Sequence, residues 1–478
     1  MRYSMLVHLT GMANTLLEAA QYLQVSSDES LREELTNNGR QMLEQMKETL
    51  LHFKADLKSD MPLRRLDSLQ TLWERMGEEA GIEEALSEFA AALPTEVHYQ
   101  VRAVFFAELG EKWDAMESVY TFMREDPRFD PVVVLTPVFR IAKQANGETK
   151  QDTIYKDYLT ARGIPFFAYN RYDIEQDCPE LAFISQPYES CTLPQFWPEH
   201  IAKYTRLVYL SYYLPDRVSQ STVESLCRLP VYHHAWKVIC SNQKHFDFYS
   251  RHSYSRGSNM MLTGLPKTDP MVLLRERELP LPSGWEKIRG KKTFLWNSWY
   301  DLKVCSLRYF EEIIHWFEQH PDCALIWRPH PMTDTVTKLH YPDAYSRFKE
   351  YQSIISAMPN GVVDGETSCE AAFRYSDAQI SDYSSLMVQY LFMDKPLLWM
   401  KNPAWNMTGE EFVSTAWMEQ AERPAQIYAF LDRVSGGVDE NTQIRREILK
   451  RDIPLADGHC GERVCNSLWD ALHEECGI

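Results

Sequence analysis

The stretch Ala324–Pro331 reads A-L-I-W-R-P-H-P, and the later stretch Gln379–Ser385 reads Q-I-S-D-Y-S-S. The first predicts a short buried strand that ends at Arg328 and His330. The second predicts a strand end, a polar turn and a helix start, because L-M-V-Q-Y-L-F-M follows it. Ligands bind at the carboxyl edge of a parallel sheet, and a cationic pair facing a hydroxyl-rich helix N-terminus suits phosphate. Together the two stretches predict a phosphate site.

Both stretches lie in the second of two series in which short apolar runs alternate with helical patterns. Continuous apolar runs separated by helices are typical of parallel strands that are buried on both faces. The sequence therefore predicts an α/β protein with two Rossmann-like parallel sheets. The expected strands are 101–107, 132–135, 166–168, 181–184, 207–210 and 238–240 in the first half, and 293–296, 324–327, 361–363, 378–380 and 396–399 in the second.

The region before the two α/β halves reads as helical. Leu31, Leu35, Met42 and Met46 follow steps of three and four residues in a charged background, which favours amphipathic helices. We expect a helical cap or a partner-binding bundle that carries no chemistry. The expected division is an α-helical N-terminal region (1–98), a first α/β domain (99–278), a linker (279–292) and a second α/β domain (293–478).

The composition is that of an ordinary globular protein. Of 478 residues, 44% are hydrophobic and 25% are charged, and no apolar run approaches the ~20 residues of a membrane span. The net charge of −18 argues against nucleic acid and acidic membranes as partners, although a local basic pocket can still hold an anionic ligand. The start of the chain is not typical of a signal peptide, and the ten cysteines include no C-x-x-C pair. We therefore expect reduced thiols in the cytoplasm.

No cofactor or metal is expected from the motifs. The sequence has no G-x-x-x-x-G-K-[ST] loop and no well-spaced G-x-G-x-x-G, so P-loop and dehydrogenase interpretations lose their main support. His459, Cys460 and Cys465 have poor spacing for zinc.

Five residues are the strongest candidates for the phosphate site: Arg328, His330, Asp382, Ser384 and Ser385. Arginine offers a fork of donors suited to phosphate oxygens, and histidine can donate a proton near neutral pH. The first turn of a helix has orphan amide donors, to which serine hydroxyls add. Two simpler alternatives stay open. One is a strand-end turn with a surface histidine, and the other is a helix for which Asp382 is only the N-cap.

Polar residues at two further strand ends are weaker candidates for contact with the same ligand. Asn297 and Ser298 either touch a ligand or cap the next turn. Asp364 and Glu366 either hold ligand hydroxyls, such as those of a ribose, or belong to a helix cap. The turn 264–269, G-L-P-K-T-D, either lies at a cleft or is an ordinary loop.

These motifs resemble those of a known family, the CDP-glycerol glycerophosphotransferases of the teichoic-acid polymerase type. The C-terminal half of that family is similar in W-R-P-H-P (327–331), S-D-Y-S-S (381–385) and D-K-P-L-L (394–398). Further similar motifs, in the same order, are K-W-D-A-M-E-S (112–118), the turn 264–269 and D-G-H-C-G-E-R-V (457–464). The resemblance covers roughly residues 100–470 and leaves out the N-terminal helices.

The resemblance implies a GT-B-like fold, with an acceptor-side first domain and a donor-binding second domain. It implies transfer of glycerol phosphate from CDP-glycerol, or of a related unit from a CDP-alditol, to a hydroxyl, with release of CMP. Arg328, His330, Ser384 and Ser385 would then contact the donor's phosphates. Such transfer needs positioning and charge neutralisation more than covalent chemistry, and no acidic metal-binding motif is evident.

One departure from the family concerns the acceptor side. The family carries a His-Gly pair after a strand of the first domain, proposed as the acceptor's base. The corresponding segment here, Leu207–Tyr213, reads L-V-Y-L-S-Y-Y and has no histidine. Asp114 and Glu117, at the first strand–helix junction, are the candidate substitutes, and with His330 they make the expected catalytic set. For each of the two acids, a cap or a surface charge is the alternative.

Three hypotheses follow from the sequence. The first is a cytoplasmic transferase that takes a CDP-activated polyol and a glycan or lipid-linked glycan acceptor, in the synthesis of a teichoic-acid-like or capsular polysaccharide. The second is a GT-B glycosyltransferase that uses a nucleotide sugar. The third is a non-catalytic relative that binds a nucleotide or serves as a scaffold. Peripheral membrane contact and an oligomer through the N-terminal helices stay open.

Overall fold

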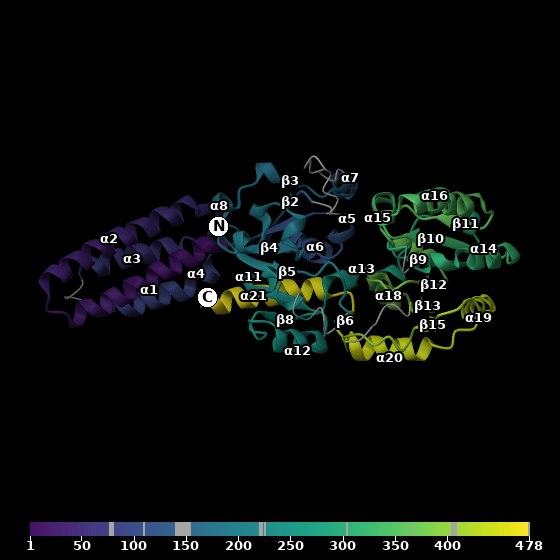
Figure 1. Cartoon of the computed structure of the whole chain (residues 1–478). Helices are drawn as coiled ribbons and strands as arrows, with labels where there is room; N and C mark the ends of the chain where they lie inside the picture. Colours follow the sequence, from purple (N-terminus) through teal and green to yellow (C-terminus); the bar gives the residue numbers. More distant parts are fainter. Residues whose placement is uncertain are drawn as a thin grey trace.

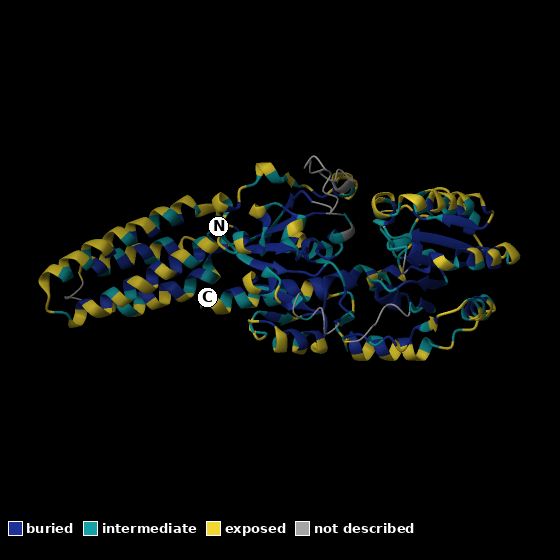
Figure 2. Cartoon of the chain, in the orientation of Figure 1, coloured by how far each residue is buried: buried dark blue, intermediate teal, exposed yellow. Residues whose placement is uncertain are grey.

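Three parts follow one another along the molecule: a helical arm, a lobe built on one parallel sheet and a lobe built on a second (Figure 1). The computed structural model describes residues 1–476 except 76–80, 109, 139–153, 219–222, 224–225, 303–304, 367 and 403–408. Both sheets are buried, whereas the outer faces of the helices are exposed (Figure 2). The predicted fold class, two parallel-sheet lobes in a GT-B-like arrangement behind N-terminal helices, is confirmed.

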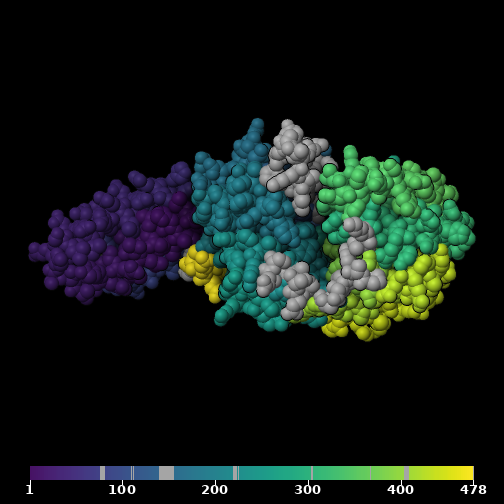
Figure 3. All heavy atoms as spheres, viewed as in Figure 1, coloured from purple at the N-terminus to yellow at the C-terminus, as the bar shows by residue number. Residues whose placement is uncertain are grey.

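The helical arm is a four-helix bundle that stands off from the first lobe (Figure 3). Its apolar stripes meet in a core of their own, and Gly39 leaves the space that the Trp73 indole fills between α2 and α3. At its base the Tyr3 hydroxyl donates to the Leu472 carbonyl oxygen at 2.7 Å, which ties the arm to the C-terminal helix. The helices are α1 (Tyr3–Val25), α2 (Glu29–His52), α3 (Met61–Glu74) and α4 (Ile82–Glu96).

The first lobe holds a seven-stranded parallel sheet of order β3-β2-β1-β4-β5-β7-β8. Its central strands are buried on both faces because V-R-A-V-F-F-A and similar runs offer apolar side chains to the helices on either side. The strands are β1 (Val101–Ala107), β2 (Phe129–Leu135), β3 (Phe167–Ala168), β4 (Leu181–Ile184), β5 (Arg206–Tyr209), β7 (Lys237–Cys240) and β8 (Met260–Leu262). The helices are α5 (Gly110–Trp113), α6 (Glu117–Glu125), α7 (Ile154–Ala161), α8 (Ile174–Asp177), α9 (Pro198–Ile201), α11 (Pro230–His234), α12 (Gln243–His252) and α13 (Asp269–Leu274).

The second lobe holds a six-stranded parallel sheet of order β11-β10-β9-β12-β13-β15. The strands are β9 (Lys292–Ser298), β10 (Cys323–Pro329), β11 (Gly361–Val363), β12 (Ala378–Ser381), β13 (Leu397–Met400) and β15 (Glu419–Ala421). The helices of this lobe are α14 (Phe310–Gln319), α15 (Thr333–His340), α16 (Pro342–Ala357), α17 (Glu370–Tyr375), α18 (Ser385–Tyr390), α19 (Pro424–Ser435) and α20 (Thr442–Asp452). After α20 the described chain ends with α21 (Cys460–Cys476). Along the chain, the predicted linker 279–292 comes after the last strand of the first sheet and ends where β9 begins.

Two segments cross between the lobes. A small antiparallel pair joins β6 (Arg217–Val218) of the first lobe to β14 (Glu410–Glu411) of the second. The last helix, α21, returns and packs against α6 (Figure 1). We therefore propose that residues 460–476 belong with the first lobe, although the sequence assigned all of 293–478 to the second domain. Among the described residues, no helix is long and apolar enough to cross a membrane.

Candidate active site

A cavity of about 200 Å³ lies between the two lobes. In the first sheet the strand order reverses between β1 and β4, and in the second it reverses between β9 and β12. Such a switch point leaves a crevice at the carboxyl ends of the strands, where ligands bind in open α/β sheets. Residues that follow β1, β9, β10 and β12 line the cavity, so both switch points contribute to one site.

Arg328 lines the cavity from the end of β10, as the sequence predicts. Its Nη1 atom donates to Asp364 Oδ2 at 2.6 Å and to the Glu366 carbonyl oxygen at 2.9 Å. The Asp364 side chain is fully buried, the Glu366 side chain is exposed, and neither residue is part of the cavity lining. The Asp364 carboxylate therefore fixes the arginine fork in place, and the expected contact of Asp364 and Glu366 with ligand hydroxyls stays a prediction.

His330 lines the cavity beside Arg328. Its ring packs against Trp299 and Tyr300, with centroid separations of 4.9 and 5.1 Å. The Met332 backbone N–H donates to Nδ1 at 3.1 Å, so the proton of the neutral imidazole resides on Nε2. The two prolines around His330 end the strand, and this packing holds the ring in one orientation. His330 can therefore donate from Nε2 to an anionic oxygen.

Asp382 lines the cavity and holds a neighbouring loop. Its Oδ2 atom accepts hydrogen bonds from the Trp299 and Ser306 backbone N–H groups at 2.8 and 2.9 Å and from the Ser306 hydroxyl at 2.8 Å. Burial raises the pKa of the Asp382 carboxyl to about 6. Asp382 does not cap the next helix, whose N-cap is Ser384, and its contact with the donor phosphate stays a prediction. Asp382 instead anchors the loop after β9 to the end of β12.

Ser384 and Ser385 stand at the start of α18 and line the cavity. The Ser384 Oγ atom is buried and has no hydrogen-bond partner among the described residues. A buried hydroxyl without a partner costs stability unless a ligand supplies one. The structure thus brings the serine pair to the same cavity as Arg328 and His330.

Asn297 and Ser298 end β9 and also line the cavity, but their side chains serve the protein. The Asn297 Oδ1 atom accepts from the Gln379 amide at 2.5 Å, and the Ser298 hydroxyl accepts from the Trp327 indole at 3.1 Å. Both side chains therefore hold neighbouring strands in register at the floor of the cavity. The predicted donor contact of these two residues stays a prediction.

The first lobe contributes an ion pair to the cavity, of which the sequence indicated only the acid as a candidate. Asp114 Oδ2 accepts from Lys267 Nζ at 2.5 Å, and both residues line the cavity. Asp114 Oδ1 is buried and makes no hydrogen bond with the described residues. Burial raises the pKa of the Asp114 carboxyl, and the charge of Lys267 opposes that rise. Asp114 therefore has a free oxygen and a basicity above that of an exposed carboxylate.

Glu117, the second acid expected on this side, also lines the cavity. It forms an ion pair with Arg162 at 3.1 Å. Burial raises the pKa of the Glu117 carboxyl, and the Arg162 charge counters part of the rise. Glu370, at the start of α17, lies close by in the cavity lining and pairs with Arg277. Among the described residues, no group of three or more His, Cys, Asp or Glu side chains is placed to hold a metal ion.

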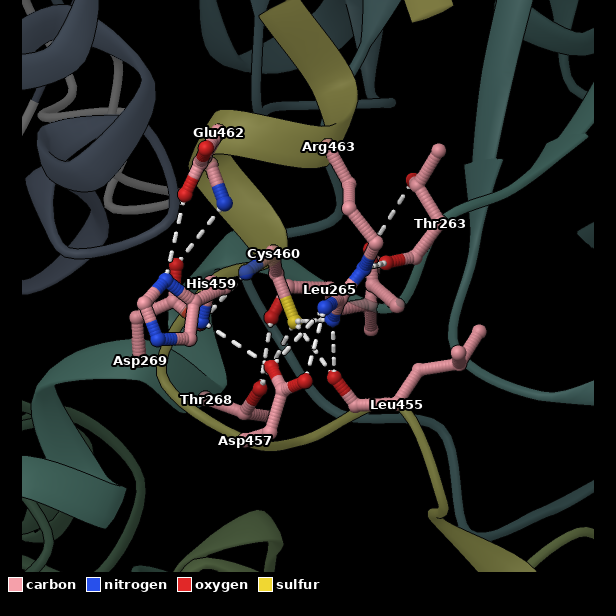
Figure 4. Close-up of polar contacts among 12 residues, drawn as sticks. Thr263, Leu265, Thr268, Asp269, Leu455, Asp457, His459, Cys460, Glu462 and Arg463 are labelled. Carbon is pink, nitrogen blue, oxygen red and sulfur yellow. Dashed lines mark hydrogen bonds and ion pairs between the residues drawn. The ribbon is translucent and has the colours of Figure 1, made fainter. Parts of the chain in front are cut away.

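The closing segment 457–464 holds the turn that carries Lys267 (Figure 4). The Asp269 carboxylate accepts from the Cys460 and Gly461 backbone N–H groups at 3.0 and 2.8 Å, which caps the first turn of α21. Arg463 Nε donates to the Thr263 carbonyl oxygen at 2.9 Å. These contacts lie behind the cavity, so the closing segment positions the turn without lining the site.

Another contact, between the lobes, reaches the serine motif. The Tyr383 hydroxyl donates to Asp216 Oδ2 at 2.6 Å, and Asp216 lies just before β6. The Phe412 backbone N–H donates to the Asp216 carbonyl oxygen at 2.6 Å, next to the β6–β14 pair. The loop that carries Ser384 and Ser385 is thus attached to both lobes.

Several cavity residues escaped the sequence analysis. Lys267 stood in a quoted turn, but nothing in the turn itself indicated its partner Asp114. Tyr212 lies in the segment that lacks the family's histidine, so the segment itself was a usable signal. Tyr158 and Glu370 occur in ordinary helical patterns, and no sequence signal distinguishes them.

A model described as CDP-glycerol:poly(glycerophosphate) glycerophosphotransferase matches residues 219–470, just over half of the 478-residue chain. The chain belongs to this family. The glycerophosphotransferase family comprises transferases of phosphate-containing groups, which confirms the predicted enzyme class. No curated protein matches the chain in sequence.

Two solved epimerase structures share the fold of this glycerophosphotransferase family member. One is a UDP-N-acetylglucosamine 2-epimerase from Listeria monocytogenes, 9% identical, with a TM-score of 0.55 over 78% of this chain and 97% of that one. Another is the Neisseria meningitidis UDP-GlcNAc 2-epimerase bound to UDP-GlcNAc, 9% identical, with a TM-score of 0.52 over 77% of this chain and 100% of that one. A variant of the wall teichoic acid polymerase TagF is 10% identical, with a TM-score of 0.48 over 88% of this chain and 100% of that one.

Proposed function

We propose that this chain transfers a polyol phosphate from CDP-glycerol, or from a related CDP-alditol, to a hydroxyl acceptor and releases CMP. The observation that carries the proposal is the cavity, which gathers Arg328, His330 and Ser384 from one lobe and Asp114 from the other. Cations and hydroxyl donors on one wall suit a diphosphate, and a carboxylate with a free oxygen on the opposite wall suits a hydroxyl nucleophile. Membership of the family supports the same reaction.

In this proposal the acceptor oxygen attacks the phosphorus atom that carries the polyol. The bond from that phosphorus to the bridging oxygen breaks, and CMP leaves with the electron pair. Asp114 takes the proton of the acceptor hydroxyl. Arg328 and the Nε2–H group of His330 neutralise the charge that grows on the departing phosphate. The serine hydroxyls and the first amides of α18 hold the donor's other phosphate oxygens.

The test is product analysis with purified protein. CDP-glycerol, CDP-ribitol and a set of UDP-sugars are each offered with a lipid-linked or alkyl-linked glycan acceptor. We expect free CMP and a new phosphodiester in equal amounts from a CDP-polyol. A nucleoside diphosphate released from a UDP-sugar would instead establish a glycosyltransferase. Binding of CDP-glycerol without turnover on any acceptor would favour a non-catalytic relative.

The Ser384→Ala/Ser385→Ala variant tests the phosphate cradle. We expect it to weaken CDP-glycerol binding by about 10²–10⁴-fold, because it removes two hydrogen bonds to a charged group, and such bonds contribute ~1.5–3 kcal/mol each. The melting temperature should hardly change, since Ser384 Oγ has no partner within the described protein. Calorimetry measures the affinity, and Ser353→Ala, on the exposed face of α16, is the matched control. Unchanged affinity in the double variant would remove the serine pair from donor binding.

We place the reaction in the cytoplasm, in the synthesis of a teichoic-acid-like or capsular glycan. All ten cysteines are free thiols, as suits a reducing compartment. The acceptor in this proposal is a glycan or a lipid-linked glycan, and the net charge of −18 argues against nucleic acid as a partner.

A further inference from the structure

The first-lobe side of the cavity presents three carboxylates close together. They come from three different places: Asp114 follows α5, Glu117 begins α6, and Glu370 begins α17. Burial raises the pKa of both Asp114 and Glu117 most, the paired cation lowers each, and the charge of Glu370 adds a smaller rise. The three acids therefore lie within electrostatic reach of one another. Only one of their three cationic partners, Lys267, is itself part of the cavity lining. The lining on this side is therefore predominantly anionic.

Two tyrosines stand beside these acids. Tyr158 of α7 and Tyr212, after β5, both line the cavity. Burial raises the pKa of each phenol, which keeps both hydroxyls protonated at neutral pH. The Arg162 guanidinium covers one face of the Tyr158 ring at 4.3 Å, and the Lys112 ammonium covers the Tyr212 ring at 5.0 Å. The two rings are thereby fixed as apolar surfaces with a hydroxyl at the edge.

This wall differs in chemistry from the wall opposite. Arg328, His330 and Ser384 offer donors, and they suit phosphate oxygens. The first-lobe wall offers carboxylate acceptors, phenol donors and aromatic surface. Sugar and polyol hydroxyls can donate to carboxylates and accept from phenols, and their C–H faces pack on aromatic rings. A phosphate in the same place would meet three carboxylates and a single ammonium, that of Lys267, in the cavity lining, and an excess of like charge is how a site rejects a wrong partner.

We propose that the acceptor half of the cavity takes the hydroxyl end of a neutral glycan, a sugar or polyol without phosphate on its last units, in preference to a chain of polyol phosphates. This inference rests on the proposed function, since it assigns the second substrate of the same site. It makes the chain an enzyme that places polyol phosphate on an unphosphorylated glycan. The reaction that supplies its acceptor is then a sugar transfer.

The test is binding of acceptors without any donor. Two probes of similar length are compared by calorimetry: a neutral alkyl-linked disaccharide and a synthetic oligomer of glycerol phosphate. We expect the disaccharide to bind at least about tenfold more tightly, because like charges oppose the oligomer. Equal or tighter binding of the oligomer overturns the inference, and so does the absence of binding by both probes.

A variant that removes two of the carboxylate charges tests the inference by a gain of oligomer affinity, which mere loss of structure would not produce. Glu117→Gln with Glu370→Gln leaves Arg162 and Arg277 uncompensated, so oligomer affinity should rise while disaccharide affinity falls or stays level. Glu475→Gln is the matched control, because Glu475 also pairs with an arginine, Arg206 at 3.0 Å, far from the cavity. If the double variant does not fold, Glu370→Gln alone is measured. No gain of oligomer affinity in a folded variant overturns the inference.

The donor experiment stands apart from these measurements. If CDP-polyols do not react or bind while the neutral disaccharide keeps its preference, the proposed function fails and the acceptor inference survives. If CDP-glycerol reacts with the phosphate oligomer better than with the disaccharide, the inference fails and the proposed function survives.

Discussion

The His330→Ala variant is expected to lose transfer activity by about 10²–10⁴-fold while it keeps its fold, which is the range for one proton-donating side chain. The ring contacts Trp299 and Tyr300, and its Nδ1 atom accepts from the Met332 N–H group, so Nε2 carries the proton. Alanine removes the only imidazole in the described cavity lining. The charge that builds on the leaving CMP would then rest on Arg328 and the helix terminus alone.

The measurement is steady-state release of CMP from CDP-glycerol, with the melting temperature taken in parallel. His315→Ala is the matched control, because the His315 ring is 63% exposed on α14 and remote from the cavity. We expect the control to have ordinary activity. Wild-type turnover by the His330 variant would remove this residue from the mechanism.

The sheets were predictable because they depend on local composition. Apolar runs such as 101–107 and 324–327 are long enough for a buried strand and too short for a helix, and each lies in a parallel sheet as expected. The strands missed were short ones. β6 and β14 have two residues each and depend on pairing between the lobes, and β8 and β15 have three residues each at the edges of the two sheets. The return of α21 to the first lobe was missed as well, since a periodic helix does not indicate which sheet it packs on.

On the second-lobe side of the cavity, the positions of the candidate residues were predictable, but the role of each residue was less so. Arg328 and His330 stand at the end of β10, and the serine pair follows β12. Only β9 separates these two strands in the sheet, so topology brings their carboxyl ends to the same edge. Asp364 and Asp382 also follow strands of this sheet, yet Asp364 fixes an arginine and Asp382 anchors a loop. A sequence does not distinguish a carboxylate that meets a ligand from one that meets its own backbone.

The first-lobe wall of the cavity could be predicted only in part, because the contacts among its residues are long-range. Asp114 and Lys267 are 153 positions apart, and only the fold makes them a pair. Glu370 reaches the first-lobe acids from the opposite lobe. The Asp114–Lys267 pair depends on contact between α6 and the turn Pro266–Thr268, and the place of Glu370 depends on the packing of α13 against α17. The sequence offers no periodic signal for either contact.

The Asp114→Asn variant is expected to lower kcat by about 10²–10⁴-fold with little change in donor affinity, because it removes a base and preserves shape. The base works as the carboxylate, so wild-type activity should fall as pH drops through the Asp114 pKa. Burial places that pKa above the ordinary range, which moves the fall toward neutral pH. In Asp114→Asn this acid limb should vanish from the pH profile of kcat, and the residual rate should be flat there.

The Lys267→Met variant separates a catalytic role of Asp114 from a structural one. The Lys267 ammonium, 2.5 Å from Asp114 Oδ2, stabilises the carboxylate and lowers its pKa against the effect of burial. Without that charge the Asp114 pKa rises further, so the acid limb should move to higher pH while the rate at alkaline pH recovers. A protein that had merely lost structure would show a lower rate at every pH and a lower melting temperature. An unshifted limb in Lys267→Met, or an acid limb that persists in Asp114→Asn, would assign the base to another residue of the first-lobe wall.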